Sequence, residues 1–148
     1  GVSDLCLVRL GKEYSRILNG IQAGKVELED VGEEYRGDFD IALAAVEMDG
    51  FSLQYVSGEL RNDETIVLAA VRESGAALRH VEGALLANLD VVLTAVQDFG
   101  EALQYAPPEL RRDRRVALAA VKQDPSAIRF VPSELLDDRD FALALLKF

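Results

Sequence analysis

The sequence is poor in the residues that bind metals, form disulfides or cross membranes. It has one cysteine, one histidine and no tryptophan. Cys6 alone can form neither an intramolecular disulfide nor a thiolate metal site, and we expect it to be a small buried apolar residue. No apolar run approaches the roughly 20 residues that span a bilayer, and we expect no signal peptide. We therefore expect an intracellular protein without a membrane partner, or one delivered into a host cell if the source is bacterial.

Positive charge is also scarce. Against 26 acidic residues the chain has 16 Lys and Arg, which gives a formal net charge of -10 over 148 residues. Such a protein lacks the basic surface that neutralises phosphates, so we expect no nucleic-acid partner. The acidic excess is uneven, because residues 1–75 hold 7 basic and 15 acidic residues whereas residues 76–148 hold 9 and 11.

Much of the acidic excess lies in residues 27–40. This segment has one basic residue, Arg36, and seven acidic ones: Glu27, Glu29, Asp30, Glu33, Glu34, Asp38 and Asp40. Their spacing does not fit a calcium-binding loop, which needs oxygen ligands at alternating positions around a glycine and a closing glutamate. We expect a solvated face here, and a docking patch for a basic partner is the alternative.

Apolar residues, by contrast, are abundant (49%) and recur with a period of 25 residues. The period is uninterrupted over residues 38–137 and joins Val46, Val71, Val96 and Val121; Leu43, Leu68, Leu93 and Leu118; and Leu53, Leu78, Leu103 and Ile128. A fixed period of this length is typical of repeat architectures. We predict a single domain over 1–148, composed of a cap (1–12), a degenerate repeat (13–37), regular repeats (38–62, 63–87, 88–112 and 113–137) and half a repeat (138–148).

One unit, residues 38–62, predicts a helix followed by two shorter segments. Asp38 is a good N-cap residue, and the position is repeated as Asp63, Asn88, Asp113 and Asp138. A helix of about ten residues follows and ends at Gly50, where we expect a left-handed backbone conformation. Residues 51–56 predict a helix of one to two turns, and residues 57–61 predict a single turn.

The first helix of the unit is apolar on almost all sides, over residues 41–46. Such a helix needs neighbours on several sides, which stacked copies provide. Small residues such as Ala44 and Ala45 would let adjacent helices approach closely, and no alternating β pattern is present. These features predict an all-α fold, specifically a right-handed α-helical solenoid of the alpha-alpha superhelix kind, with one longer helix and one or two short helices per copy.

The repeated pattern is D-x-x-x-x-L-x-A-V-x-x-x-G-x-x-L-x-Y-[AV]-x-x-E-L-R-x-D, best matched by residues 38–63 and 88–113. It resembles a helical-repeat family, the domain of unknown function numbered forty-one sixteen. Residues 38–148 fit the pattern well, whereas residues 13–37 fit it poorly. The resemblance implies tandem helical copies, and it transfers no catalytic or binding residue.

The inventory of catalytic residues is small. The only histidine, His80, takes the position of Tyr55, Tyr105 and Phe130 in the other copies, so we expect its ring to pack rather than to catalyse or to bind a metal. We therefore expect no enzyme, no cofactor and no metal site. An enzyme that uses carboxylates such as Glu59 and Asp63 is the alternative.

The only basic cluster is Arg-Arg-Asp-Arg-Arg at residues 111–115. It has no interleaved aromatic residues, which argues against a nucleic-acid site. We expect these arginines to pair with acidic residues of adjacent copies, such as Asp90, Asp138 and Asp140, at about 0–1 kcal/mol for each exposed pair.

One polar position recurs in the copies with changing charge, and a ring follows it. We call these residues the strip: Gln54, Tyr55, Arg79, His80, Gln104, Tyr105 and Arg129. If the strip lines one surface of the stack, it is the natural recognition surface. The alternative is that its members are ordinary solvent-exposed residues of the short helices, and the sequence favours neither.

These observations favour a monomeric, non-catalytic module that binds another protein or a peptide. The expectation rests on the uninterrupted repeat and on analogy with other repeat proteins, which is association only. A structural spacer between domains of a longer protein is the alternative.

Overall fold

The computed structural model describes the backbone of residues 4–147 and the side chains of residues 11–147. This part of the chain is all-helical and contains no strand, which confirms the predicted class. The α-helices are α1 (Asp4–Gln22), α2 (Glu33–Arg36), α3 (Phe39–Met48), α4 (Glu64–Glu73), α5 (Leu89–Asp98), α6 (Pro108–Arg111), α7 (Arg114–Gln123), α8 (Ser133–Leu136) and α9 (Arg139–Leu145). The 3-10 helices are η1 (Leu28–Asp30), η2 (Gly50–Tyr55), η3 (Leu60–Asn62), η4 (Gly75–His80), η5 (Gly83–Ala87), η6 (Gly100–Tyr105) and η7 (Pro125–Phe130).

The regular copies share one internal order of elements. We number them copy 1 to copy 4, for residues 38–62, 63–87, 88–112 and 113–137. Each contains an α-helix of 10 residues, a 3-10 helix of 6 residues and a shorter helical turn. The predicted ten-residue helix is confirmed, and the predicted second helix is of the 3-10 kind.

The N-caps of the long helices are the residues expected from the sequence. The Asp38 side chain accepts a hydrogen bond from the backbone N–H of Ile41 at 3.1 Å, and Asp63 accepts one from Ile66 at 3.2 Å. The same bond type starts α5, α7 and α9. Each cap satisfies backbone donors that a helix start leaves free, so the repeated polar residue fixes where each long helix begins.

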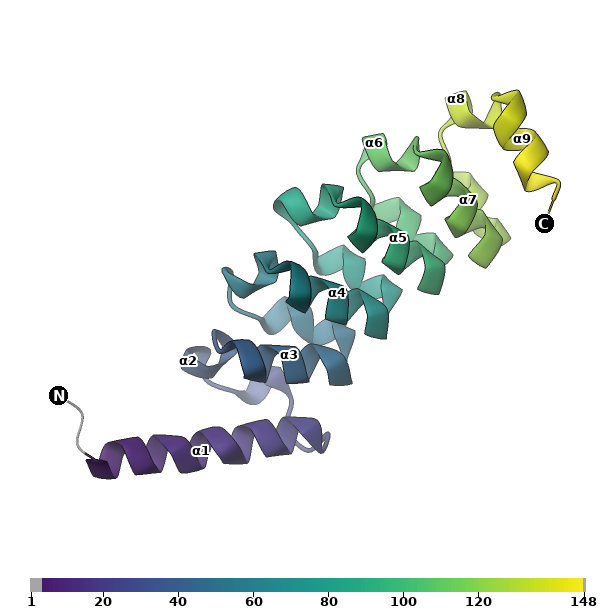
Figure 1. Cartoon of the computed structure of the whole chain (residues 1–148). Helices are drawn as coiled ribbons and strands as arrows, with labels where there is room; N and C mark the ends of the chain where they lie inside the picture. The colour runs from purple at the N-terminus through teal and green to yellow at the C-terminus, as the bar shows by residue number, and fades with distance from the viewer. Residues whose placement is uncertain (1–3, 148) are drawn as a thin grey trace.

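Neighbouring copies pack in chain order. Helix α1 packs on α3, α3 on α4, α4 on α5, α5 on α7, and α7 on α9. The 3-10 helices form a second row, in which η2 contacts η4, η4 contacts η6, and η6 contacts η7. The result is an elongated array with α1 at one end and α9 at the other (Figure 1).

The buried side chains form one cluster that runs through the whole array. Ile41, Ile66, Val91 and Val116 hold equivalent positions in the four copies, and each is fully buried. Since each long helix has neighbours on several sides, its almost uniformly apolar sequence is accounted for. Burial is shared among the junctions between copies rather than gathered in one central core.

The prediction that Gly50 adopts a left-handed conformation is wrong. Among the described residues only Gly24 and Gly83 have a positive φ. Helix α3 ends at Met48, and its C-cap residue, Asp49, is extended with φ -151° and ψ 108°. Gly50 is needed because a Cβ there would lie well under 3.0 Å from the carbonyl oxygen of Ala70 in copy 2. The position demands space next to the adjacent copy, not an unusual backbone angle.

The two ends of the array differ from the regular copies. Helix α1 runs without a break across the predicted boundary between residues 12 and 13. In the degenerate repeat, Ile21, Leu28 and Val31 are buried as their positions in the repeat predict. The expectation that Cys6 is buried falls outside the described side chains. At the other end Leu146 is 80% exposed, whereas Val46 at the equivalent position is fully buried.

Candidate functional site

The structure places the strip on the row of 3-10 helices. Gln54 and Tyr55 lie on η2, Arg79 and His80 on η4, Gln104 and Tyr105 on η6, and Arg129 on η7. Because these helices contact one another in order, equivalent strip residues lie on adjacent elements. Gln54, Arg79 and Arg129 are exposed, and the other four are partly buried. The strip is therefore continuous along the array and open to solvent.

The rings of the strip are partly buried against the array. His80 meets the Phe51 ring edge-on, with ring centroids 6.0 Å apart. Burial, helped by the charges of Arg79 and Arg61, lowers the pKa of His80 below its ordinary value of 6.5. A half-buried imidazole kept neutral in this way fits the packing role expected from the sequence.

Arg129 is held at the C-terminal end of the strip. Its guanidinium lies 2.6 Å from a carboxylate oxygen of Glu101, in the preceding copy, and 4.7 Å from the centroid of the Phe130 ring. Glu101 also accepts a hydrogen bond from the Ser126 hydroxyl at 3.2 Å. The strip thus has a fixed cation at this end.

A hollow of about 410 Å³ lies at the N-terminal end of the strip, lined by Gln54 and Tyr55 together with Glu33 and Arg36. The Arg36 side chain donates to the carbonyl oxygens of Val31 (2.8 Å) and Glu29 (2.6 Å), which fixes it at the rim. Hydrogen bonding to Glu29 and burial raise the pKa of Tyr55 above its ordinary value of 10.0. The phenol therefore stays neutral at physiological pH and can donate or accept a hydrogen bond.

A second set of polar contacts, which sequence reasoning missed, joins adjacent copies. The backbone N–H of Gly50 donates to the Glu73 carboxylate at 2.6 Å, that of Gly75 to Asp98 at 2.7 Å, and that of Gly100 to the Gln123 amide oxygen at 2.6 Å. We call each of these bonds a clamp. The signal in the sequence is an oxygen-bearing side chain 23 residues after each of these glycines.

The clamps stop where the glycine is replaced. Lys25 stands at the glycine position of the degenerate repeat, and its N–H donates to the carbonyl of Gly20 at 2.8 Å. The matching acceptor position holds Met48. In copy 4 the glycine is replaced by Pro125, which has no N–H to donate. Donor and acceptor are thus lost together at the junction before copy 1.

The arginines of the basic cluster have intramolecular partners. Arg111 donates to the carbonyl of Ala106, Arg112 lies 3.5 Å from Glu134, and Arg114 pairs with Asp138 and Asp140. These contacts confirm the expected pairing with Asp138 and Asp140 in the following half repeat. Arg115 departs from it: its guanidinium bonds Asp113, the cap of its own helix, at 2.9 Å.

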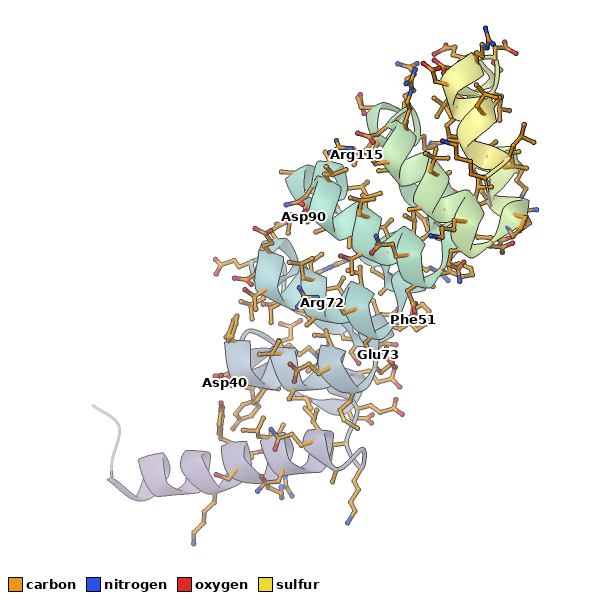
Figure 2. All side chains as sticks on the ribbon, turned by 45° about the vertical axis from the view of Figure 1, so that its right-hand side comes forward. Asp40, Phe51, Arg72, Glu73, Asp90 and Arg115 are labelled. Atoms are coloured by element: carbon orange, nitrogen blue, oxygen red, sulfur yellow. The ribbon has the colours of Figure 1, made fainter. Side chains whose placement is uncertain are left out.

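The long helices present a different surface from the strip. Asp40, Asp90 and Arg115 lie near their N-terminal ends along one edge of the array (Figure 2). Six of the seven acids in residues 27–40 are exposed, as expected of a solvated face. The seventh, Asp38, caps α3 and accepts a hydrogen bond from the Tyr14 hydroxyl at 3.0 Å, and burial with this bond raises the pKa of Tyr14 to about 12.

The two carboxylates considered for catalysis have different surroundings. Asp63 is occupied as the N-cap of α4, and Glu59 is exposed in the preceding turn. Within the described residues there is no group of three His, Cys, Asp or Glu side chains that could hold a metal ion. In the same part of the chain, no helix has the length and apolar character needed to cross a membrane.

The comparison with protein families gives three matches to one model, described as a domain of unknown function (DUF4116). The matched segments are residues 28–85, 88–136 and 113–148. They cover most of the chain and overlap in copy 4, as tandem copies of one unit do. No curated protein and no solved structure matches the chain.

Proposed function

Since the chain belongs to the family of the domain of unknown function DUF4116, we propose its function from its surface: it is a non-catalytic helical-repeat module that binds a protein or a peptide along the strip. The observation that carries the proposal is the continuity of the strip. Exposed polar residues and partly buried rings recur at one register and lie on contacting 3-10 helices. Rings with a polar rim are typical of surfaces that bind other proteins.

The architecture that we propose for this module is a right-handed solenoid of a single chain, monomeric in solution. Supporting it, each copy contacts its neighbours in sequence order through two parallel rows of helices. Copies arranged in this way present equivalent residues at regular intervals, which is how repeat proteins build extended binding surfaces.

Photo-crosslinking in the native source tests the binding role. A photoreactive phenylalanine analogue at position 54, 79 or 104 lies on the strip, and the same analogue at Arg72 or Gln97 lies on the long helices as a control. We expect the strip positions to give the same crosslinked protein, and the control positions to give none. Crosslinks of equal yield from both surfaces would contradict the proposal.

Matched charge reversals then test the surface with the purified crosslinked protein. Arg79→Glu and Arg72→Glu make the same charge change in the same copy, one on the strip and one on α4. We expect Arg79→Glu to weaken binding at least tenfold and Arg72→Glu to change it less than twofold. If no partner binds, and if deletion of residues 63–87 leaves the function of the native protein intact, a spacer role replaces the proposal.

A further inference from the structure

The junction between the degenerate repeat and copy 1 is the one described junction before copy 4 that lacks a clamp. At the regular junctions the glycine backbone approaches the next copy so closely that a Cβ would overlap a carbonyl oxygen. Lys25 has a Cβ, and its N–H is already bonded within the turn after α1. The segment after α1 therefore cannot approach α3 as closely as the regular copies approach one another.

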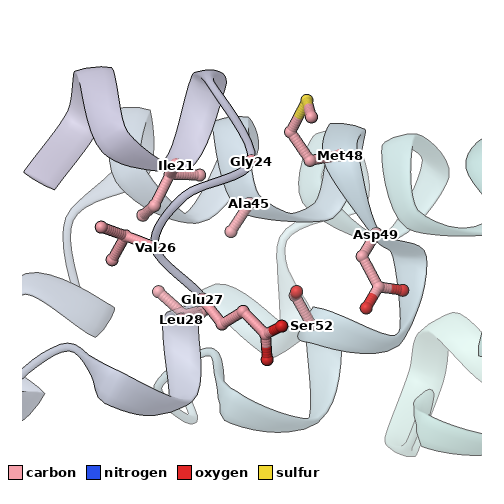
Figure 3. A pocket seen from close by; sticks show the side chains of 9 residues that line it. All are labelled: Ile21, Gly24, Val26, Glu27, Leu28, Ala45, Met48, Asp49 and Ser52. Atoms are coloured by element: carbon pink, nitrogen blue, oxygen red, sulfur yellow. The ribbon is translucent and has the colours of Figure 1, made fainter.

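A cavity of about 180 Å³ lies at this junction, between the end of α1, η1 and the C-terminal end of α3 (Figure 3). Its apolar lining includes Ile21, Leu28 and Ala45, all buried. An apolar cavity of about 150 Å³ accommodates a benzene molecule. The cavity therefore has room for a ligand group of about six non-hydrogen atoms.

Oxygen-bearing side chains of Glu27, Asp49 and Ser52 lie together on one side of the cavity (Figure 3). Ser52 is only 8% exposed. Its hydroxyl has no hydrogen-bond partner among the described residues and is directed into the cavity. Asp49 uses one carboxylate oxygen to accept the backbone N–H of Phe51 at 2.9 Å, which leaves the other oxygen available.

The hydroxyl is peculiar to this junction. The equivalent positions in copies 2, 3 and 4 are Ala77, Ala102 and Ala127, each fully buried. The Ser52 oxygen is accessible from the cavity, so a ligand there can donate a hydrogen bond to it.

The chemistry of the cavity selects a small cation with several N–H donors. Glu27 and Asp49 supply negative charge and Ser52 a neutral acceptor, and none of the described residues that line the cavity is basic. A primary ammonium group has one positive charge and three donors, which matches three acceptors. The apolar lining suits a short alkyl stem. We propose that this cavity binds a primary alkylammonium group, supplied by a lysine side chain of a peptide or by a free small amine.

This site is independent of the strip, and titration with simple amines tests it. The probe is n-butylamine at pH 7, followed through the backbone amide resonances of the isotope-labelled full chain. We expect saturable shifts confined to residues 21–28 and 45–52. Butyltrimethylammonium has the same charge and stem but no N–H donor, and we expect it to bind at least tenfold more weakly. N-acetyl-lysine methylamide tests the peptide source, because tighter binding than that of n-butylamine assigns the site to a lysine side chain.

Substitutions separate the cavity from general attraction to an acidic protein. We expect Ser52→Ala and Glu27→Gln each to weaken n-butylamine binding at least threefold, and Glu47→Gln, an exposed carboxylate of α3 outside the cavity, to have no effect. The double variant Lys25→Gly with Met48→Glu restores the clamp residues, so it should close the cavity and abolish binding while the protein keeps its helical circular dichroism. Equal binding of the trimethylammonium probe, or unchanged binding in both Ser52→Ala and Glu27→Gln, would overturn the proposal.

Discussion

Three glycines lie in close contact with the backbone of the next copy. A Cβ at Gly50, Gly75 or Gly100 would overlap a carbonyl oxygen there. A Cβ at Gly75 would lie well under 3.0 Å from the carbonyl oxygen of Ala95 and 3.0 Å from the Phe99 side chain. Backbone atoms cannot move aside as a flexible side chain can. A methyl group at these positions must therefore push two copies apart.

We expect Gly75→Ala to lower the free energy of unfolding by about 1–3 kcal/mol, the usual cost of overpacking a well-packed interior. Gly58→Ala is the matched control, because a Cβ there meets nothing within 4 Å and its φ is not positive. The control should be neutral or slightly stabilising. Urea unfolding measures both, and equal destabilisation by the two substitutions would refute the steric account.

His80 gives the protein a pH-dependent stability near neutrality. Its pKa in the folded chain is lowered, chiefly by burial, whereas an unfolded chain has an ordinary value of about 6.5. Below this value the unfolded state takes up a proton that the folded state resists, so the stability contributed by the neutral ring is complete above about pH 6.5 and declines as the pH falls.

We expect the urea midpoint of the protein to fall between pH 7.5 and pH 5.5, and His80→Tyr to remove most of this change. Tyrosine stands at the same position in copies 1 and 3, so the variant should fold. The lowered pKa values of Asp113, Asp124 and Asp138 act at lower pH, below their ordinary 3.8. An identical fall in both proteins would show that other groups are responsible.

At the scale of the helices, the sequence predicts where elements begin better than how they are wound. The five N-caps were predictable because a cap residue bonds to backbone only two or three residues further on. The 3-10 winding of η2, η4, η6 and η7 was not, because it depends on packing against rows of other copies. The role of Gly50 was missed for the same reason: the atom that it must avoid belongs to residue 70.

The two candidate sites also differ in whether the sequence could predict them. The strip was identified from the sequence because its residues recur at one register. The cavity beside Ser52 was not, since its lining residues belong to the degenerate repeat and to copy 1 and come together only when these two copies are in contact. The 25-residue period identifies positions that recur, whereas this cavity lies at a junction where the repeat pattern is not kept.

The clamps also connect helices of adjacent copies. Substitutions of Asp98 test how much one clamp contributes to the free energy of unfolding. We expect Asp98→Ala to lower the free energy of unfolding by about 1–3 kcal/mol, because the buried N–H of Gly75 loses its acceptor. Asp98→Asn keeps an oxygen acceptor, as Gln123 does in the next copy, and should change stability by less than about 0.5 kcal/mol. Urea unfolding of the two variants measures the difference, and equal losses would show that the charge matters rather than the hydrogen bond.

At the scale of the whole molecule, the length of the array depends on the number of copies. We expect insertion of a second copy of residues 63–87 after residue 87 to give a folded protein whose longest dimension is greater by about 10 Å, one helix spacing. The one new junction keeps both clamp residues, Gly75 and Glu73. Small-angle X-ray scattering measures the dimension, and a slope of unfolding free energy against urea that rises with the added length is the independent check.

A scrambled 25-residue insert of the same composition at the same place is the control. It should enlarge the particle without adding helical circular dichroism or buried surface. An unchanged longest dimension in the duplicated variant would contradict the arrangement of copies in a row.

Each clamp is divided between two copies, the donor in one and the acceptor in the next. Any coding segment one repeat long that lies within residues 49–124 therefore carries one donor and one acceptor, wherever along the repeat it starts. Unequal crossing-over within the gene can add or remove such a segment and still leave every regular junction complete. Because every regular junction keeps its clamp, the protein can still fold after a whole repeat is added or removed. A protein built around a single core would lose its fold after such a change.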